Sequence, residues 1–322
     1  MPHILMIATG GTIASRAAAE GGPVTAQLGG PDLLAGVDLP EGVEVTVRGF
    51  ASLGSYALTL ADLHDLAALL ASEMTDYDGV VITHGTDTME ETAFALELLL
   101  APPIPVILTG AQRHAGQADT DGPRNLRDAI LAAATPALGA AGVAILFEGD
   151  LHAARHVRKS HTSRVDTFRS GDFGKIGSVD VGRIDLRHLP QRLAPLGLDA
   201  APQEVALISA AMGMGPELLH FALGHPYRAV ILEGFGRGNF PQGWAEATAA
   251  LTAAGKPVIV TSRCPEGAVR PIYGKDSGGT SMAAAGAIFA GDLAGNKARI
   301  LLAFLLGHPS LDAETEFERY CA

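Results

Sequence analysis

Three short polar segments hold most of the residues that could carry out chemistry. Residues 8–14 read ATGGTIA, residues 83–88 read THGTDT and residues 109–113 read TGAQR. Thr12 follows two glycines, which permit backbone turns closed to other residues, and a threonine hydroxyl becomes a covalent nucleophile when a base accepts its proton. Thr86 adds a second hydroxyl, and Asp87 adds a carboxylate that could position a water or bind an ammonium group.

Lys159 is the first lysine after these segments, within residues 158–162 (RKSHT). A buried lysine close to an aspartate can be tuned toward a general base. Each feature alone is a weak signal, because a Gly-Gly-Thr sequence is more often only a turn. The chemistry therefore depends on whether the fold brings the segments together.

Each of the three polar segments directly follows a short apolar run that predicts a strand. Strands are expected at residues 3–8, 43–47, 79–83, 105–109, 142–147, 204–209, 229–233 and 257–261. Helical patterns lie between them, and capping boxes predict two helix starts, at Thr59 and at Thr88. This alternation predicts mostly parallel sheets with right-handed crossovers, in which ligands bind where strands end.

The length of 322 residues and the change of pattern at 186–203 predict two domains. That stretch contains three prolines and shows no clear period. The expected fold is α/β, with each domain an open, mostly parallel sheet flanked by helices. The expected boundaries are a larger catalytic domain at 1–189, a linker at 190–204 and a smaller domain at 205–322.

Composition narrows the class of protein. Lys plus Arg is 23 and Asp plus Glu is 35, giving a net charge of −12, which argues against a nucleic-acid partner. No apolar stretch approaches the roughly 20 residues of a membrane span, and no signal peptide is visible, so a cytoplasmic protein is expected. Two scattered cysteines predict neither a disulfide framework nor a zinc site.

Competing motifs lack support. Residues 10–12 form neither a dinucleotide-binding fingerprint nor a phosphate loop, and no serine nucleophile elbow is present. His152 and His156 have a spacing that could place two imidazoles on one helix, but flanking cationic residues would repel a metal ion. No metal site is predicted, and His84 is the better candidate for a residue that orients the site.

Taken together, the segments resemble the signature motifs of the bacterial-type L-asparaginases. The second motif, extended to residues 83–92 (THGTDTMEET), is highly specific. The likeness spans nearly the whole chain, continuing through residues 109–113, 121–123, 125–126, 159, 236–239 and 297–302. It implies hydrolysis of asparagine and, to varying degrees, glutamine, without metal or cofactor. It also implies tetramers built from close dimers, with the site at the dimer interface.

The resemblance assigns roles by position. It makes Thr12 the nucleophile that forms an acyl-enzyme, with Thr86 as the second hydroxyl, Asp87 as the carboxylate for the substrate ammonium, and Lys159 as the lysine that sustains proton transfer. The substrate-binding positions that it implies, besides Thr86 and Asp87, are Gly11, Gly54, Ser55, Ala111 and Asn239. Gly54 and Ser55 match the dipeptide for the α-carboxylate, the Ala111 carbonyl would receive the side-chain amide, and Asn239 would come from a neighbouring subunit.

Two departures concern the group that activates Thr12. Well-known members carry a tyrosine on a mobile loop after the first motif, whereas here the first of five tyrosines is Tyr56. They also supply a glutamate from the adjacent subunit, where this chain has glycines at 278–279. Tyr273 or Asp276 could serve instead, and residues 16–28, rich in Gly and Ala, are expected to form a lid.

Two other functions remain open. One is the asparaginase-like subunit that feeds ammonia to a tRNA-dependent amidotransferase, which usually carries an extra N-terminal domain, whereas here the first strand begins at His3. The other is a non-catalytic amino-acid-binding protein that kept the pocket. The presence of all four polar residues of the expected site favours an enzyme; they are Thr12, Thr86, Asp87 and Lys159. A site that no longer catalyses a reaction should lose such costly polar groups.

Overall fold

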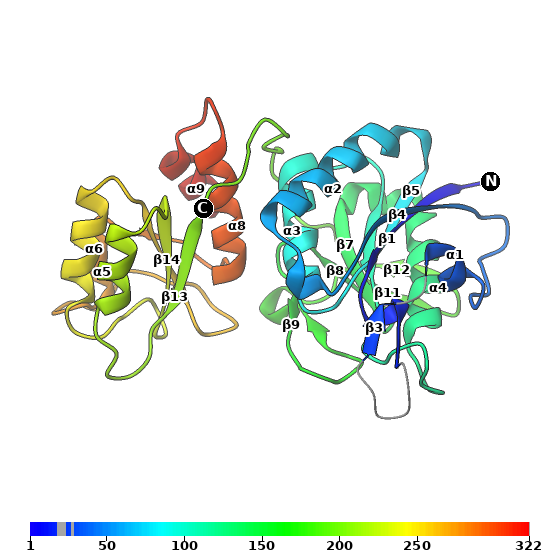
Figure 1. The fold of residues 1–322 in the computed structure, drawn as a ribbon, viewed down its shortest axis with the longest axis horizontal. Helices are drawn as coiled ribbons and strands as arrows, with labels where there is room; N and C mark the ends of the chain where they lie inside the picture. Colours follow the sequence, from blue (N-terminus) through cyan, green and yellow to red (C-terminus); the bar gives the residue numbers. More distant parts are fainter. Residues whose placement is uncertain (18–23, 27–28, 322) are drawn as a thin grey trace. The chain divides into compact units, whose positions relative to one another are not determined.

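A computed structural model describes residues 1–17, 24–26 and 29–321 of the chain. It divides into two compact units, residues 1–195 and 196–322, each built around its own sheet (Figure 1). The division falls within the segment 190–204. The predicted α/β fold, with a larger, mostly parallel N-terminal sheet and a smaller, parallel C-terminal sheet, is confirmed.

Among the described residues, the first unit has an eight-stranded sheet in the order β12-β11-β8-β7-β6-β5-β1-β4. Its strands are β1 (His3–Gly10), β4 (Glu44–Leu53), β5 (Gly79–Thr83), β6 (Val106–Thr109), β7 (Val143–Phe147), β8 (Asp150–Ala153), β11 (Gly177–Asp180) and β12 (Arg183–Leu186). The strands from β4 through β7 pair in parallel, whereas β8, β11 and β12 extend the sheet with antiparallel pairs. Two small antiparallel ribbons pair β2 (Ser15–Ala17) with β3 (Val24–Ala26) and β9 (Arg158–Lys159) with β10 (Phe168–Arg169).

Helices cover both faces of this sheet. Figure 1 shows α2 (Leu60–Glu73) and α3 (Met89–Leu100) on one face, and α1 (Gly30–Leu34) and α4 (Gly122–Ala133) on the other. Strands β5, β6 and β7 are buried along their whole length, as their continuous apolar sequences require for strands covered on both sides. The framework that carries the polar segments is therefore a rigid core element.

One of the two predicted capping boxes is confirmed and the other is wrong. At α2, the Thr59 hydroxyl accepts a hydrogen bond from the Asp62 N–H at 3.2 Å, and the Asp62 carboxylate accepts the Thr59 N–H at 2.8 Å. At α3, the Thr88 hydroxyl makes no cap bond and instead donates to the Ser55 carbonyl at 2.9 Å. A tertiary contact has replaced the local one.

The second unit has the parallel order β13-β14-β15-β16. Its elements are β13 (Val205–Ser209), α5 (Glu217–Gly224), β14 (Ala229–Gly234), α6 (Trp244–Ala253), β15 (Val258–Ser262), α7 (Gly279–Ala284), β16 (Ile288–Phe289), α8 (Gly295–Gly307) and α9 (Ala313–Cys321). Trp244 is fully buried at its core and stacks on Phe240 at a ring-centroid distance of 5.2 Å.

All eight strands expected from the sequence are present. The helical placement of His152 and His156 is wrong: His152 lies on β8, and His156 follows that strand and stacks on Phe173 at 3.6 Å between ring centroids. In the described part of the chain, no helix is both long and apolar enough to cross a membrane.

Candidate active site

The three polar segments meet at one edge of the first sheet. They follow β1, β5 and β6, which are adjacent and parallel, so their carboxyl ends lie side by side. The buried Thr9 hydroxyl at the end of β1 donates to the Thr83 carbonyl at 2.9 Å. This is the edge at which open α/β sheets bind ligands.

Glycines allow the turns to touch backbone to backbone. Gly11 has φ 83° and ψ −176°, a conformation essentially restricted to glycine. A Cβ atom on Gly11 would lie 2.4 Å from the Gly85 nitrogen, and one on Gly85 would lie 2.7 Å from the Ser55 hydroxyl. The turns that carry Thr12, Thr86 and Ser55 are therefore packed in a row, in direct contact.

Thr12 begins a short 3-10 turn (Thr12–Ala14) and is partly exposed, whereas Ile13 and Ala14 are buried. The Ser15 hydroxyl donates to the Gly11 carbonyl at 2.8 Å and closes this turn. The turn holds its nucleophile candidate at the surface while its apolar residues anchor it in the core.

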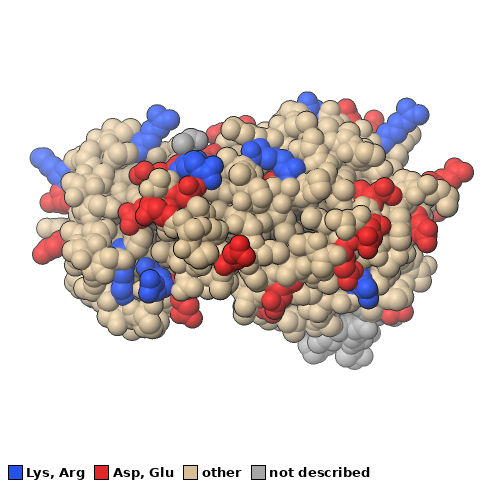
Figure 2. All heavy atoms as spheres, turned by 90° about the horizontal axis from the view of Figure 1, so that it is seen from above, with Lys and Arg blue, Asp and Glu red and all other residues tan. Residues whose placement is uncertain are grey.

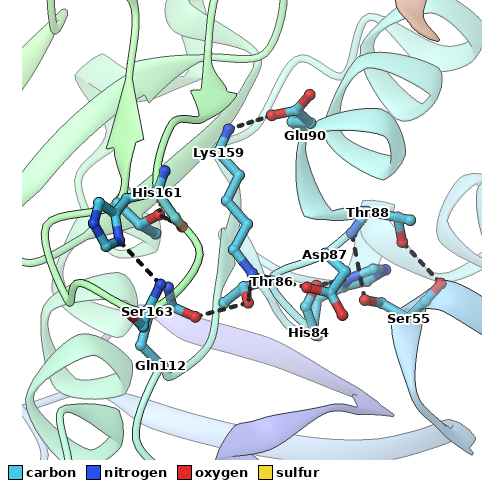
Figure 3. A network of polar contacts seen from close by, with 12 residues as sticks. Ser55, His84, Thr86, Asp87, Thr88, Glu90, Gln112, Lys159, His161 and Ser163 are labelled. Atoms are coloured by element: carbon cyan, nitrogen blue, oxygen red, sulfur yellow. Dashed lines mark hydrogen bonds and ion pairs between the residues drawn. The ribbon is translucent and has the colours of Figure 1, made fainter.

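Lys159 links the second hydroxyl to the carboxylate (Figure 3). Its Nζ lies 2.8 Å from the Thr86 hydroxyl and 2.8 Å from Asp87 Oδ1. The lysine side chain is 15% exposed and the aspartate side chain 58%, so a largely buried cation faces a carboxylate open to solvent. The structure thus brings Lys159 to Thr86 and Asp87, from which it is more than 70 residues away in the chain.

Glu90 is a site residue that the sequence analysis missed. Its carboxylate accepts the backbone N–H of Lys159 and so ties β9 to the start of α3 (Figure 3). Glu90 is 9% exposed. The sequence places it inside a predicted capping box, and nothing in its local pattern points to a partner 69 residues away.

The third segment is held by a buried carboxylate. Asp121 is 4% exposed and accepts the backbone N–H groups of Gln112 at 3.0 Å and Arg113 at 2.9 Å. The Asn125 amide also donates to it, at 3.1 Å. Ala111, directly before the held residues, is fully buried, so its backbone is fixed.

Gln112 is a second residue whose role the sequence did not reveal. Thr86 donates to its Oε1 at 3.1 Å, and its Nε2 donates to the Arg164 carbonyl at 3.1 Å. Gln112 belongs to the polar segment 109–113, which the sequence predicts to lie at the site, but the sequence assigns no role to this residue. Its partners come from two other parts of the fold, and sequence alone does not show them.

His84 supports the second turn from within. It is fully buried, with Nδ1 2.8 Å from the Gly85 carbonyl and Nε2 3.0 Å from the Thr92 hydroxyl. Burial lowers its pKa to about 4. A neutral imidazole therefore joins the turn to α3, and its role in orienting the site stays a prediction.

The remaining candidates belong to the second unit or to the segment 16–28. Asn239 belongs to the second unit, where its Oδ1 accepts the Gly279 N–H at 3.1 Å. Tyr273, 58% exposed, and Asp276 belong to that unit as well. The expected lid at 16–28 includes residues 18–23 and 27–28, which lie outside the described residues. The part of the chain that the structure describes contains no cluster of three or more His, Cys, Asp or Glu side chains that could hold a metal ion.

Family models match both units. The model for "Asparaginase, N-terminal" covers residues 3–192, and that for "Glutaminase/Asparaginase C-terminal domain" covers residues 204–317. The chain therefore belongs to the asparaginase family of hydrolases.

Individual relatives agree with this assignment. The chain is 37% identical to a probable L-asparaginase of Deinococcus radiodurans, over 95% of this chain and 93% of that protein. A solved structure of a probable cytoplasmic L-asparaginase from Campylobacter jejuni aligns with a TM-score of 0.88 at 28% identity, covering 99% of each chain. The chain is also 33% identical to a glutamyl-tRNA(Gln) amidotransferase subunit of Methanosarcina barkeri, over 95% of this chain and 74% of that protein.

Proposed function

We propose that this protein is an L-asparaginase that hydrolyses L-asparagine to L-aspartate and ammonia through a threonine acyl-enzyme. The observation that carries the proposal is the contact of the Lys159 ammonium with both the Thr86 hydroxyl and the Asp87 carboxylate, beside the turn that bears Thr12. The names of the relatives support asparagine as the substrate.

In the proposed reaction, the Thr12 oxygen attacks the side-chain carbonyl carbon of asparagine. The Lys159 ammonium gives a proton to the departing nitrogen, so that the C–N bond breaks and ammonia leaves, and the Thr12 proton returns the lysine to its ammonium form. The Thr86 oxygen accepts hydrogen bonds from both groups while this happens. Water then attacks the resulting ester, releases aspartate and restores the Thr12 hydroxyl. Backbone N–H groups of the two glycine-rich turns would stabilise the oxyanion, which is worth about 3 kcal/mol per donor in hydrolases that use this device.

Substrate binding is assigned to groups around this centre. Asp87, open to solvent on one side, would hold the substrate ammonium group, and Gly54 with Ser55 would hold its α-carboxylate. The Ala111 carbonyl would accept the side-chain amide, and Gly11 would line the turn under the nucleophile. Asn239 would reach the substrate from a neighbouring subunit, and Tyr273 and Asp276 remain predicted partners for the activation of Thr12.

The direct test is ammonia release from L-asparagine by the purified protein and by Thr12→Ala. The wild type should turn over, whereas Thr12→Ala should lose activity by about 10⁴-fold or more and keep its thermal midpoint. Full activity in Thr12→Ala would refute the proposed nucleophile. Calorimetric binding of aspartate without any turnover by the wild type would instead indicate a non-catalytic binding protein.

A second candidate function is that of the asparaginase-like subunit of a tRNA-dependent amidotransferase. It is favoured by the 33% identity to the Methanosarcina barkeri amidotransferase subunit. A free-standing asparaginase should release ammonia from asparagine alone at full rate. A component of an amidotransferase should require its partner protein and charged tRNA.

The remaining expectations are a cytoplasmic location, a homo-oligomer formed as a dimer of dimers, and no nucleic-acid partner. Figure 2 shows one face of the molecule, on which acidic and basic side chains are interspersed. With a net charge of −12, such a surface gives a polyanion little to bind. Sedimentation of the purified protein would determine the oligomer.

A further inference from the structure

The side-chain amide of Gln112 lies between two segments of the site. It contacts the Thr86 hydroxyl with one end and the Arg164 backbone carbonyl with the other, both at 3.1 Å. Arg164 lies in the loop that connects β9, which carries Lys159, to β10. Gln112 therefore connects the turn that bears Thr86 to the hairpin that bears Lys159.

The chemistry of these partners fixes which end of the amide faces which group. A backbone carbonyl can only accept, so the NH₂ end of Gln112 must face Arg164 and the carbonyl end must face Thr86. An amide oxygen also only accepts, so the Thr86 hydroxyl must donate its one proton to Gln112. The direction of each hydrogen bond thus follows from the one before it.

The direction of this proton also determines which hydrogen bonds the Thr86 oxygen can make. With its proton committed to Gln112, that oxygen presents only lone pairs to its other neighbours. One lone pair accepts from Lys159 Nζ at 2.8 Å, and the other can accept from the hydroxyl of a nucleophile. A hydroxyl turned the other way would direct its proton at the lysine ammonium.

The loop between β9 and β10, whose Arg164 carbonyl accepts from Gln112, is itself held in place. His161 Nδ1 accepts the backbone N–H groups of Ser163 at 3.1 Å and Arg164 at 3.0 Å. Figure 3 shows the His161 to Ser163 bond on the opposite side of Gln112 from Thr86. The Arg164 carbonyl is thus a fixed acceptor, which gives Gln112 a firm point of attachment.

We propose that Gln112 is a positioning residue for the reaction, whose amide fixes the direction of the Thr86 hydroxyl and keeps its lone pairs available to Lys159 and to the nucleophile. This inference rests on the proposed function. It concerns a residue that acts through Thr86 and does not itself touch the substrate.

Two substitutions separate this role from simple anchoring of the hairpin. Gln112→Met is close in size and removes both the acceptor for Thr86 and the donor to Arg164. Gln112→Glu keeps an acceptor for Thr86 but has no donor for Arg164. Gln117→Met, at an exposed position on the following turn, is the matched control.

The measurement is kcat and KM for L-asparagine, each taken at the optimum pH of the variant, together with the thermal midpoint. Gln112→Met should lower kcat about tenfold, roughly the effect of one hydrogen bond, and change KM less than threefold. Gln112→Glu and the control should stay within threefold of the wild type. Equal losses in the Met and Glu variants would show that only the anchoring matters, and a fully active Met variant would also overturn the proposal.

A structural measurement keeps the two proposals distinguishable. If the wild type does not hydrolyse asparagine, the proposed function fails, and the inference is decided by an atomic-resolution crystal structure of the wild type. Hydrogen positions should show the Thr86 proton directed at Gln112 and the NH₂ group at Arg164. A flipped amide would refute the inference whatever the activity.

Discussion

The two units of this protein have parallel sheets of similar design but treat the carboxyl ends of their strands differently. In the first unit, polar side chains at this edge bond one another as well as the backbone, and Lys159 contacts both Thr86 and Asp87. In the second unit they bond the backbone: Ser262 donates to the Gly236 carbonyl at 2.7 Å, and Arg263 donates to the Ala210 carbonyl at 2.7 Å. On the proposed function, this edge serves reaction chemistry in the first unit, whereas these bonds of the second unit build turns.

Of the substitutions that test this difference between the units, replacement of Lys159 should have the largest effect on activity. Lys159→Met removes the group that contacts both Thr86 and Asp87, and kcat should fall by about 10²–10⁴-fold. Lys175→Met is the control, since Lys175 forms its ion pair with Asp150 and should change kcat less than twofold. Steady-state ammonia release measures both, and equal losses in the two variants would contradict a special role for Lys159.

The glycine contact beneath Thr12 should be the most important for stability. Gly11→Ala forces a side chain into a glycine-only conformation, 2.4 Å from the Gly85 nitrogen, and should lower the free energy of unfolding by about 3 kcal/mol or more. Gly42 also has a positive φ, 74°, but no atom lies within 4 Å of an added Cβ.

Gly42→Ala should therefore cost only about 1–2 kcal/mol, the strain of a left-handed residue. Chemical denaturation of both variants tests the difference. Equal losses would mean that backbone strain, and not the contact between the two turns, makes Gly11 necessary.

Acidification should weaken the first unit through two buried histidines. Burial lowers the pKa of His84 and of His152 to about 4, against 6.5 for an exposed histidine. Between pH 6.5 and 4 the unfolded chain binds these protons and the folded chain does not, so stability falls as the pH falls. Each histidine should contribute about 3 kcal/mol to this loss by pH 4.

His152→Gln isolates one of the two contributions. The variant should lose less free energy of unfolding between pH 7 and pH 4.5 than the wild type, as measured by urea denaturation at each pH. An unchanged pH dependence would show that folding does not lower the pKa of His152.

The smallest effect on activity is expected in the second unit. Ser262→Ala removes the bond to Gly236 and the acceptor for the Cys264 N–H, at a cost of about 1 kcal/mol in stability. Because these bonds only build a turn, kcat for asparagine should stay within twofold of the wild type. A larger loss would mean that this edge also takes part in the reaction.

Local sequence patterns predicted much of the fold. Continuous apolar runs such as residues 79–83 are buried on both faces of the sheet, so their composition alone indicates a central strand. The pattern fails where a distant partner competes with a local one. Thr88 and Glu91 form a plausible capping box in sequence, yet the Thr88 hydroxyl bonds Ser55, and Glu90, which lies between them, bonds Lys159.

In the candidate site, too, local sequence predicts some residues, and contacts with distant parts of the chain determine others. Thr12, Thr86 and Asp87 lie in turns directly after strands, so their convergence follows from a parallel sheet. Gln112 and Glu90 matter through partners more than 25 residues away in the chain, which no local signal reveals. The hydrogen-bond directions around Thr86 depend on the Arg164 carbonyl, which the fold brings to Gln112 from 52 residues away in the chain.

The most direct test of the central claim is to trap the acyl-enzyme. The purified protein would be mixed with L-asparagine, quenched with acid within milliseconds, digested and analysed by mass spectrometry. An aspartyl ester on the peptide that contains Thr12, absent from Thr12→Ala, is the result expected. Turnover with no adduct on that peptide, or an adduct on another residue, would contradict the assignment of Thr12 as the nucleophile.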